Sequence, residues 1–243
     1  VQTLRKKSYR PEVLTIGANT DPYPPAERDR RITRRLLETL LESRHPVALI
    51  TKSALILRDL DLLSELAASD LVQVFVSVTT LESKLSRIME PRAASPARRL
   101  EVVRQLTEAG VPVGVMAAPM IPAINDAELD KILEAAAGAG ARTCSYIQVR
   151  LPLEIKELFE AWLDEHFADR KDKVLGLIRQ TRGGRLYDSS FGVRMRGQGT
   201  YAELLARRFD VARRRYGLLE RLPPLSSEQF SPPIAVGDQL SLL

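Results

Sequence analysis

Short polar residues gather in one loop near the start of the chain, within residues 13–27. Gly17 allows a close approach of the backbone, and Asn19, Thr20 and Asp21 supply short hydrogen-bonding groups. The loop follows a short apolar run that predicts a buried strand, and ligands bind at the C-terminal ends of strands in α/β folds. The same residue types are common in turns and helix caps, so a ligand site and a structural turn both remain open.

More polar groups follow the next two predicted strands. Thr51, Lys52 and Ser53 come directly after the apolar run 47–50, and Ser77 lies near the end of the run 72–78. Taken alone, Lys52 and Ser77 are most simply explained as a solvated lysine and a strand-end serine.

Apolar runs alternate with amphipathic segments over residues 13–149. A helix beginning at Pro96 is predicted by Ser95 as its N-cap and ends before Gly110. The alternation predicts an α/β fold with a parallel sheet. Five strands with short polar sequences at their C-terminal ends favour a partial (β/α) barrel over an open doubly wound sheet. No Gly-x-Gly-x-x-Gly follows a strand, which weakens the dinucleotide-binding alternative. The predicted strands are 13–16, 47–50, 72–78, 111–117 and 142–149, and the predicted helices are 27–42, 55–68, 96–109 and 125–137.

The chain changes character after residue 152. We predict a barrel core over residues 1–152, a helical, arginine-rich extension over 153–221 and an extended tail over 222–243. Within the extension, arginines are interleaved with Tyr187, Phe191, Tyr201 and Phe209. That composition suits a nucleic-acid partner, and equally a helical appendage with a solvated charged face. Arg92, Arg98 and Arg99 leave the same two readings open, a phosphate contact or a solvated helix face.

Charge and cysteine content narrow the classes further. The chain has 36 Lys and Arg against 31 Asp and Glu, a net charge of +5, which is compatible with a polyanionic partner. It contains no apolar run of about 18 residues, so we expect no membrane span and a cytoplasmic location. The single cysteine, Cys144, excludes an intrachain disulfide and a cysteine-rich cluster site built from this chain alone, and a small buried residue is its simplest reading.

Five segments of the core carry a recognisable pattern: GANTDPYPPAE (17–27), ITKS (50–53), VSVTT (76–80), MEPRAASPARRL (89–100) and GVPVGVMAAPMIPAIND (110–126). They resemble the radical S-adenosylmethionine (SAM) superfamily, in its branch similar to spore photoproduct lyase and often labelled DNA-repair-photolyase-like. A further segment, TRGGRLYDSSFGVRMRGQGTYAELLARRF at residues 181–209, looks like one uncharacterised subgroup.

This resemblance implies cofactors and a binding site. Members of the family hold a [4Fe-4S] cluster with three clustered cysteines and cleave S-adenosyl-L-methionine to a 5′-deoxyadenosyl radical. The resemblance places cofactor-binding roles on Thr20, Asp21, Lys52 and Ser77, with Asp21 toward the ammonium and Lys52 toward the carboxylate. Asn19 also belongs to this site, where spore photoproduct lyases carry a hydrogen-donating cysteine, so thymine-dimer reversal by that route is not expected.

The resemblance also implies what is missing. The cluster loop belongs on a first strand, and this chain starts just before the second. The expected fold is therefore a partial (β/α)6 TIM-like barrel lacking the first strand, with a C-terminal helical extension. We expect a radical SAM enzyme core, lyase-like and acting on nucleic acid in DNA repair, whose cluster ligands lie in a longer parent protein. The alternative is a non-catalytic nucleic-acid-binding or scaffold module with a degenerate barrel.

The last five residues, QLSLL, predict a partner of another kind. They resemble the QLxLF peptide by which bacterial polymerases and mismatch-repair proteins dock on the DNA sliding clamp. Gln239 offers an amide, and Leu240, Leu242 and Leu243 can fill apolar pockets. A frayed tail, or a strand docked on the protein's own surface, is the alternative.

Overall fold

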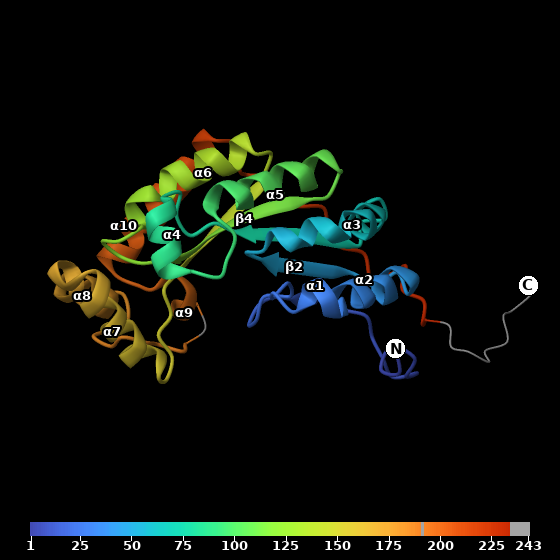
Figure 1. The fold of residues 1–243 in the computed structure, drawn as a ribbon, viewed down its shortest axis with the longest axis horizontal. Helices are drawn as coiled ribbons and strands as arrows, with labels where there is room; N and C mark the ends of the chain where they lie inside the picture. The colour runs from blue at the N-terminus through green and yellow to red at the C-terminus, as the bar shows by residue number, and fades with distance from the viewer. Residues whose placement is uncertain (191, 234–243) are drawn as a thin grey trace, which may run out of the picture.

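The computed structural model describes residues 1–190 and 192–233 and contains one parallel sheet (Figure 1). Its strands follow one another in chain order across the sheet. A doubly wound sheet reverses its strand order at a switch point, whereas a barrel does not, so the order confirms a partial barrel. The strands are β1 (Leu14–Ile16), β2 (Val47–Thr51), β3 (Val72–Ser77), β4 (Val113–Met120) and β5 (Thr143–Gln148).

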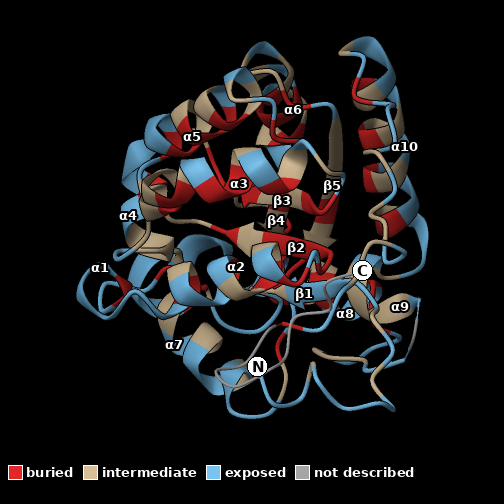
Figure 2. Ribbon diagram, turned by 90° about the vertical axis from the view of Figure 1, so that its right-hand side faces the viewer, coloured by how far each residue is buried: buried red, intermediate tan, exposed pale blue. Residues whose placement is uncertain are grey.

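Four helices cover one face of this sheet: α2 (Ile32–Glu42), α3 (Leu60–Ala67), α5 (Pro96–Glu108) and α6 (Leu129–Gly138) (Figures 1 and 2). Alternate residues of the central strands, such as Val74, Val113 and Val115, are fully buried beneath them. The prediction of a buried first strand is wrong, because Leu14 of β1 is 40% exposed. β1 forms an edge of the sheet and pairs only with β2 among the described residues.

The predicted helix boundaries hold best where a cap was visible in the sequence. The Ser95 hydroxyl accepts a hydrogen bond from Arg98 N, and Gly110 has a positive φ of 78° just after α5. The predicted helix 27–42 is instead broken at Arg31, whose φ of 50° separates α1 (Glu27–Arg30) from α2. The predicted helix 55–68 begins as the 3₁₀ helix η1 (Ala54–Asp59) and continues as α3.

The helix predicted over residues 125–137 also starts differently. A 3₁₀ turn, η2 (Asp126–Glu128), precedes α6, and the Asn125 side chain does not cap it. Asn125 is fully buried, accepts from Ile121 N at 2.6 Å and donates to the carbonyls of Thr79 and Pro119 at 2.8 and 2.9 Å. Asn125 therefore links the loops after β3 and β4, which is a tertiary role that a capping pattern cannot reveal.

The C-terminal extension is helical, as expected, and contains helices of different lengths. Two of them, α7 (Ile155–His166) and α8 (Lys171–Gln180), are joined by η3 (Ala168–Arg170) and form a separate apolar cluster. A short helix, α9 (Val193–Arg196), precedes α10 (Thr200–Arg215), which packs on α6 and joins the main core. No helix among the described residues is long and apolar enough to cross a membrane.

After α10, the described part of the tail crosses the loops at the N-terminal ends of the strands. Leu219 bridges Thr143, Ser226 N donates to Asp70 O at 3.2 Å, and Ser231 N donates to Ser43 O at 2.9 Å. Residues 222–233 form no helix or strand and include a turn at Glu228 and Gln229. The proposed clamp-binding residues, Gln239, Leu240, Leu242 and Leu243, lie outside the described residues, so clamp docking stays a prediction.

Candidate functional site

A cavity of about 550 Å³ lies at the C-terminal ends of the strands. Every strand end contributes to its lining, and Met195 of α9 adds to it. We call this cavity the cleft. The peptide between Ala118 and Pro119, which also line it, is cis. Gly17 is needed here because a Cβ atom at this position would lie 2.0 Å from Ile50 O, so glycine lets the ends of β1 and β2 approach each other.

Four of the five residues that the sequence marks as a binding site line this cleft. Asn19 and Asp21 follow β1, Lys52 follows β2, and Ser77 ends β3. Thr20 is exposed and does not line it. The structure thus brings together side chains from three separate strand ends, while their binding roles stay predictions.

Asp21 fixes the loop after β1 onto β2. Its Oδ1 accepts from Thr51 Oγ1 at 2.8 Å and from Tyr23 N at 2.9 Å, and its Oδ2 accepts from Lys52 N at 2.7 Å. A carboxylate has about four acceptor sites, so one direction remains for a ligand donor. Asp21 is therefore a positioning residue of the cleft in addition to any contact with a ligand.

The Lys52 ammonium is paired with a carboxylate that the sequence did not single out. Lys52 Nζ lies 2.5 Å from Glu90 Oε1, and Glu90 Oε2 accepts from Arg99 at 2.6 Å and from Thr79 Oγ1 at 2.9 Å. Burial raises the pKa of Glu90, but the charges of Lys52 and Arg99 outweigh it and hold this pKa below its usual value. The ion pair with Glu90 thus holds the Lys52 side chain in place at the rim of the cleft.

The sequence left two interpretations open for Arg99, a phosphate contact or a solvated helix face, and its surroundings exclude both. Arg99 is 1% exposed and donates to Ser77 O at 3.0 Å and to Ala94 O at 2.7 Å. It therefore neither forms a solvated helix face nor offers a free contact to phosphate. Together with Glu90, it supports the backbone at the end of β3, on which Ser77 lies.

Gln148, at the end of β5, is a cleft residue that the sequence analysis missed. It is 2% exposed, and its Nε2 has no hydrogen-bond partner among the described residues. A buried donor without a partner costs about 1–3 kcal/mol, so such groups point to a missing acceptor. The available signal was a long polar side chain near the C-terminal end of the predicted strand 142–149.

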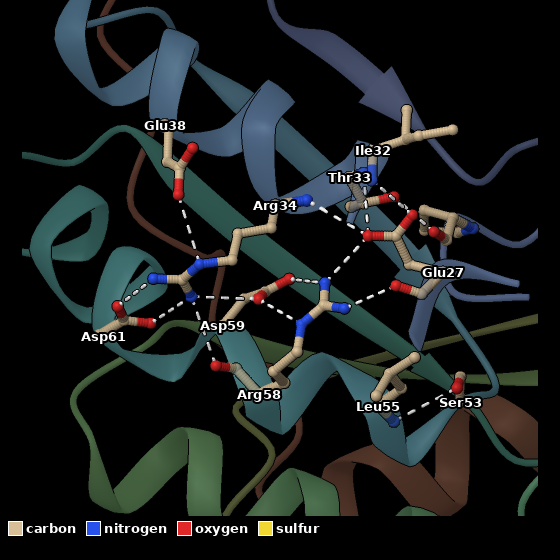
Figure 3. Close-up of polar contacts among 11 residues, drawn as sticks. Glu27, Ile32, Thr33, Arg34, Glu38, Ser53, Leu55, Arg58, Asp59 and Asp61 are labelled. Atoms are coloured by element: carbon tan, nitrogen blue, oxygen red, sulfur yellow. Dashed lines mark hydrogen bonds and ion pairs between the residues drawn. The ribbon is translucent and has the colours of Figure 1, made fainter. Parts of the chain in front are cut away.

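An ion-pair cluster outside the cleft holds its loops in place (Figure 3). Arg58 of η1 contacts Glu27 Oε1 at 2.9 Å and Asp59 Oδ1 at 2.8 Å, while Arg34 of α2 contacts Asp59 and Asp61 at 3.2 and 2.7 Å. Glu27 also accepts from Thr33 N at 3.0 Å. Burial raises the Glu27 pKa, but the Arg58 side chain and the backbone N–H groups of residues 32–34 outweigh burial and lower this pKa. The cluster joins α1 and α2, which follow the loop after β1, to η1 and α3, which follow the end of β2.

Cys144 is the single cysteine of the chain and lies within β5. Burial raises the pKa of its thiol to about 12. No group of three or more Cys, His, Asp or Glu suited to a metal occurs among the described residues. A [4Fe-4S] cluster held by three thiolates therefore does not fit this chain's own residues.

Comparison with known proteins decides the family. The family model for the Radical SAM superfamily matches residues 1–136. The chain belongs to this superfamily. An uncharacterised protein of Mycobacterium tuberculosis is 33% identical over 162 residues, which are 66% of this chain and 48% of that protein. An uncharacterised protein of Acidianus two-tailed virus is 40% identical over 116 residues, 48% of this chain and 37% of that one. The matched part of the chain thus spans about half the length of the mycobacterial relative and 37% of the viral one.

Among solved structures, spore photoproduct lyase complexed with dinucleoside spore photoproduct matches with a TM-score of 0.65 and 14% identity, over 88% of this chain and 61% of that one. A mutant of the lyase with bound AdoMet and dinucleoside spore photoproduct matches with a TM-score of 0.58 and 16% identity, over 88% and 60%. These likenesses establish a shared fold. Family membership implies S-adenosylmethionine and an iron–sulfur cluster as cofactors. The cleft has the size of a cofactor pocket and presents amide, carboxylate, ammonium and hydroxyl groups, so its residues fit the first of these two groups.

Proposed function

We propose that this chain forms the S-adenosylmethionine-binding and substrate-facing part of a radical SAM enzyme that acts on nucleic acid, in the manner of a DNA-repair lyase. The observation that carries the proposal is the cleft, where Asn19, Asp21, Lys52 and Ser77 meet at the strand ends of a radical SAM fold. The cluster ligands would come from outside this chain.

In this proposal each cleft residue binds or orients the cofactor. Lys52 faces the cofactor's carboxylate, and this contact competes with its ion pair to Glu90. Ser77 donates or accepts one hydrogen bond, and the free lone pair of Asp21 accepts from the ammonium. The bound cofactor supplies the radical chemistry, while the residues of this chain hold it against the strand ends and exclude water.

Calorimetric titration of S-adenosylmethionine into the chain tests the proposal. The variants are Lys52→Ala and two matched serine variants, compared with wild type. Ser77→Ala removes a cleft hydroxyl, whereas Ser53→Ala removes a hydroxyl that caps η1 and lies outside the cleft. We expect Lys52→Ala to weaken binding about ten- to a hundredfold, because it removes the partner of a charged group, and Ser77→Ala by less. Equal affinities for Lys52→Ala, Ser77→Ala and Ser53→Ala would contradict the proposed site.

A non-catalytic nucleic-acid-binding module is the second candidate, favoured by the single cysteine. Two observations separate it from the enzyme. A C-x-x-x-C-x-x-C segment in the coding sequence before Val1 would favour the enzyme. Failure of the wild-type chain to bind S-adenosylmethionine at all would favour the module.

A further inference from the structure

The cleft continues outward across the surface. It shares Asp21 and Lys52 with a neighbouring cavity of about 220 Å³. That cavity in turn shares Tyr23, Ser53 and Arg92 with a third cavity of about 380 Å³. We call these three adjoining cavities the trough, which runs from the cleft, past Lys52, to the cavity lined by residues of α1 and α5.

Three arginines line the outer cavity of this trough: Arg28 of α1, Arg92 in the loop after α4 (Ser83–Met89), and Arg98 of α5. All three are exposed, and their guanidinium groups form no hydrogen bond or ion pair with any described residue. The acidic residue nearest to Arg98 on its helix, Glu101, is already paired with Arg104 at 2.5 Å. Among the described residues, no acidic side chain lines this outer cavity.

Like charges that converge in this way repel one another, and a polyanion relieves the repulsion. Guanidinium groups also match phosphate oxygens in geometry, with two parallel hydrogen bonds each. Arg28 is more than 60 residues from Arg92 and Arg98 in the sequence, so its place beside them is a property of the fold. A phosphate-rich ligand extending from the cleft would reach them along the trough.

We propose that Arg28, Arg92 and Arg98 bind backbone phosphates of a single-stranded nucleic acid whose reacting nucleotide lies beside the cofactor at the mouth of the cleft. The inference rests on the proposed function and deepens it by naming where the strand leaves the site. A single strand fits because its backbone phosphates can reach the basic groups at one end of the trough while one nucleotide lies at the cleft at the other end.

The arginines of the extension are less suited to this contact. Arg182 is 1% exposed, Arg208 pairs with Asp130 at 3.2 Å, and Arg196 lies over the Tyr146 ring at 4.8 Å. Helix α10, which carries many of them, lies on the opposite side of the molecule from α1 (Figures 1 and 2). Its outward-facing arginines therefore serve as a control for the outer cavity.

Fluorescence polarisation of a labelled single-stranded oligonucleotide tests the inference. The test variant replaces Arg28, Arg92 and Arg98 with alanine. The matched control replaces the exposed α10 residues Arg207, Arg214 and Arg215, which removes the same charge. We expect the test variant to bind about tenfold more weakly or worse and to lower the salt slope by about 0.7 per lost phosphate contact. The control should keep the wild-type slope.

The outcomes separate the inference from the function on which it rests. Equal losses in both variants would overturn the trough, because they would indicate a general charge effect. If the test variant bound the oligonucleotide as tightly as wild type does, only the assignment of the three arginines would be refuted, and action on nucleic acid would stand. No binding by wild type would overturn action on nucleic acid and the trough with it. A mononucleotide that competes as well as the oligonucleotide would show a single phosphate site instead of a strand. Unchanged S-adenosylmethionine binding and unfolding midpoint would confirm that the test variant is folded.

Discussion

Replacing Glu90 with glutamine should destabilise the fold strongly. Glu90 accepts hydrogen bonds or ion pairs from Lys52, Arg99 and Thr79, and its side chain is only 11% exposed. The Arg99 side chain is 2% exposed and has no other acidic partner among the described residues. Glutamine keeps the shape of the side chain but leaves the Arg99 charge buried without a counter-charge.

Breaking a buried ion pair by removing one partner costs about 3–5 kcal/mol. Glutamine still accepts one hydrogen bond, so we expect a loss near the lower limit, about 3 kcal/mol, or roughly 6–12 °C in the unfolding midpoint of a chain this long. The matched control is Glu101→Gln, which breaks an exposed pair with Arg104 and should leave the midpoint within error of wild type. Thermal and urea unfolding of both variants, followed by circular dichroism, measure the midpoint and the free energy of unfolding.

The effect should also depend on pH in a defined direction. Because the folded pKa of Glu90 is lowered, its contribution is present above the unfolded glutamate pKa, about 4.3, and is lost as the pH falls through the folded value. The difference between wild type and Glu90→Gln should therefore shrink toward zero in acid. A difference no larger than that of Glu101→Gln at neutral pH, or one that grows in acid, would refute this account of the cluster.

Other residues give simpler tests. Gln148→Leu should raise the unfolding midpoint in a thermal scan, because it removes a buried donor without a partner; a clear fall would show that the amide is satisfied. Asn125→Ala should lower stability in urea by about 1–3 kcal/mol, because Ile121 N loses its acceptor; an unchanged midpoint would contradict the proposed link between the loops. Cys144 should react with iodoacetamide only after unfolding, since burial raises its pKa to about 12; labelling at the rate of a free thiol in the native chain would disagree.

The sequence predicted what depends on neighbours along the chain. The continuous apolar run 47–50 located β2, and Ser95 with Pro96 located the start of α5, because these patterns act within one element. The break at Arg31 was missed because the buried carboxylate of Glu27, which accepts from the first amides of α2, depends on Arg58 across the fold. Local propensity carries no information about such a partner.

The same limit applies to the cleft. The sequence indicated which strand ends carry polar groups, and the resemblance selected among them. It could not pair Lys52 with Glu90, because the two are joined only when the loop after α4 folds over the end of β2. It also did not reveal that Gln148 is buried without a partner, because that depends on what packs around the end of β5.

Lys52 connects the two proposed sites. It lines both the cleft and the cavity that leads to the arginines, and its ion pair with Glu90 fixes its position between them. A carboxylate in the cleft and a phosphate in the trough would each draw on the same ammonium, and each would do so against Glu90. Glu90 also pairs with the buried Arg99, which donates to the Ser77 carbonyl oxygen. The ion pair at Lys52 is therefore linked to the backbone at the end of β3, which lines the cleft. The residues that stabilise this part of the fold therefore also set how strongly the cleft can bind an anion.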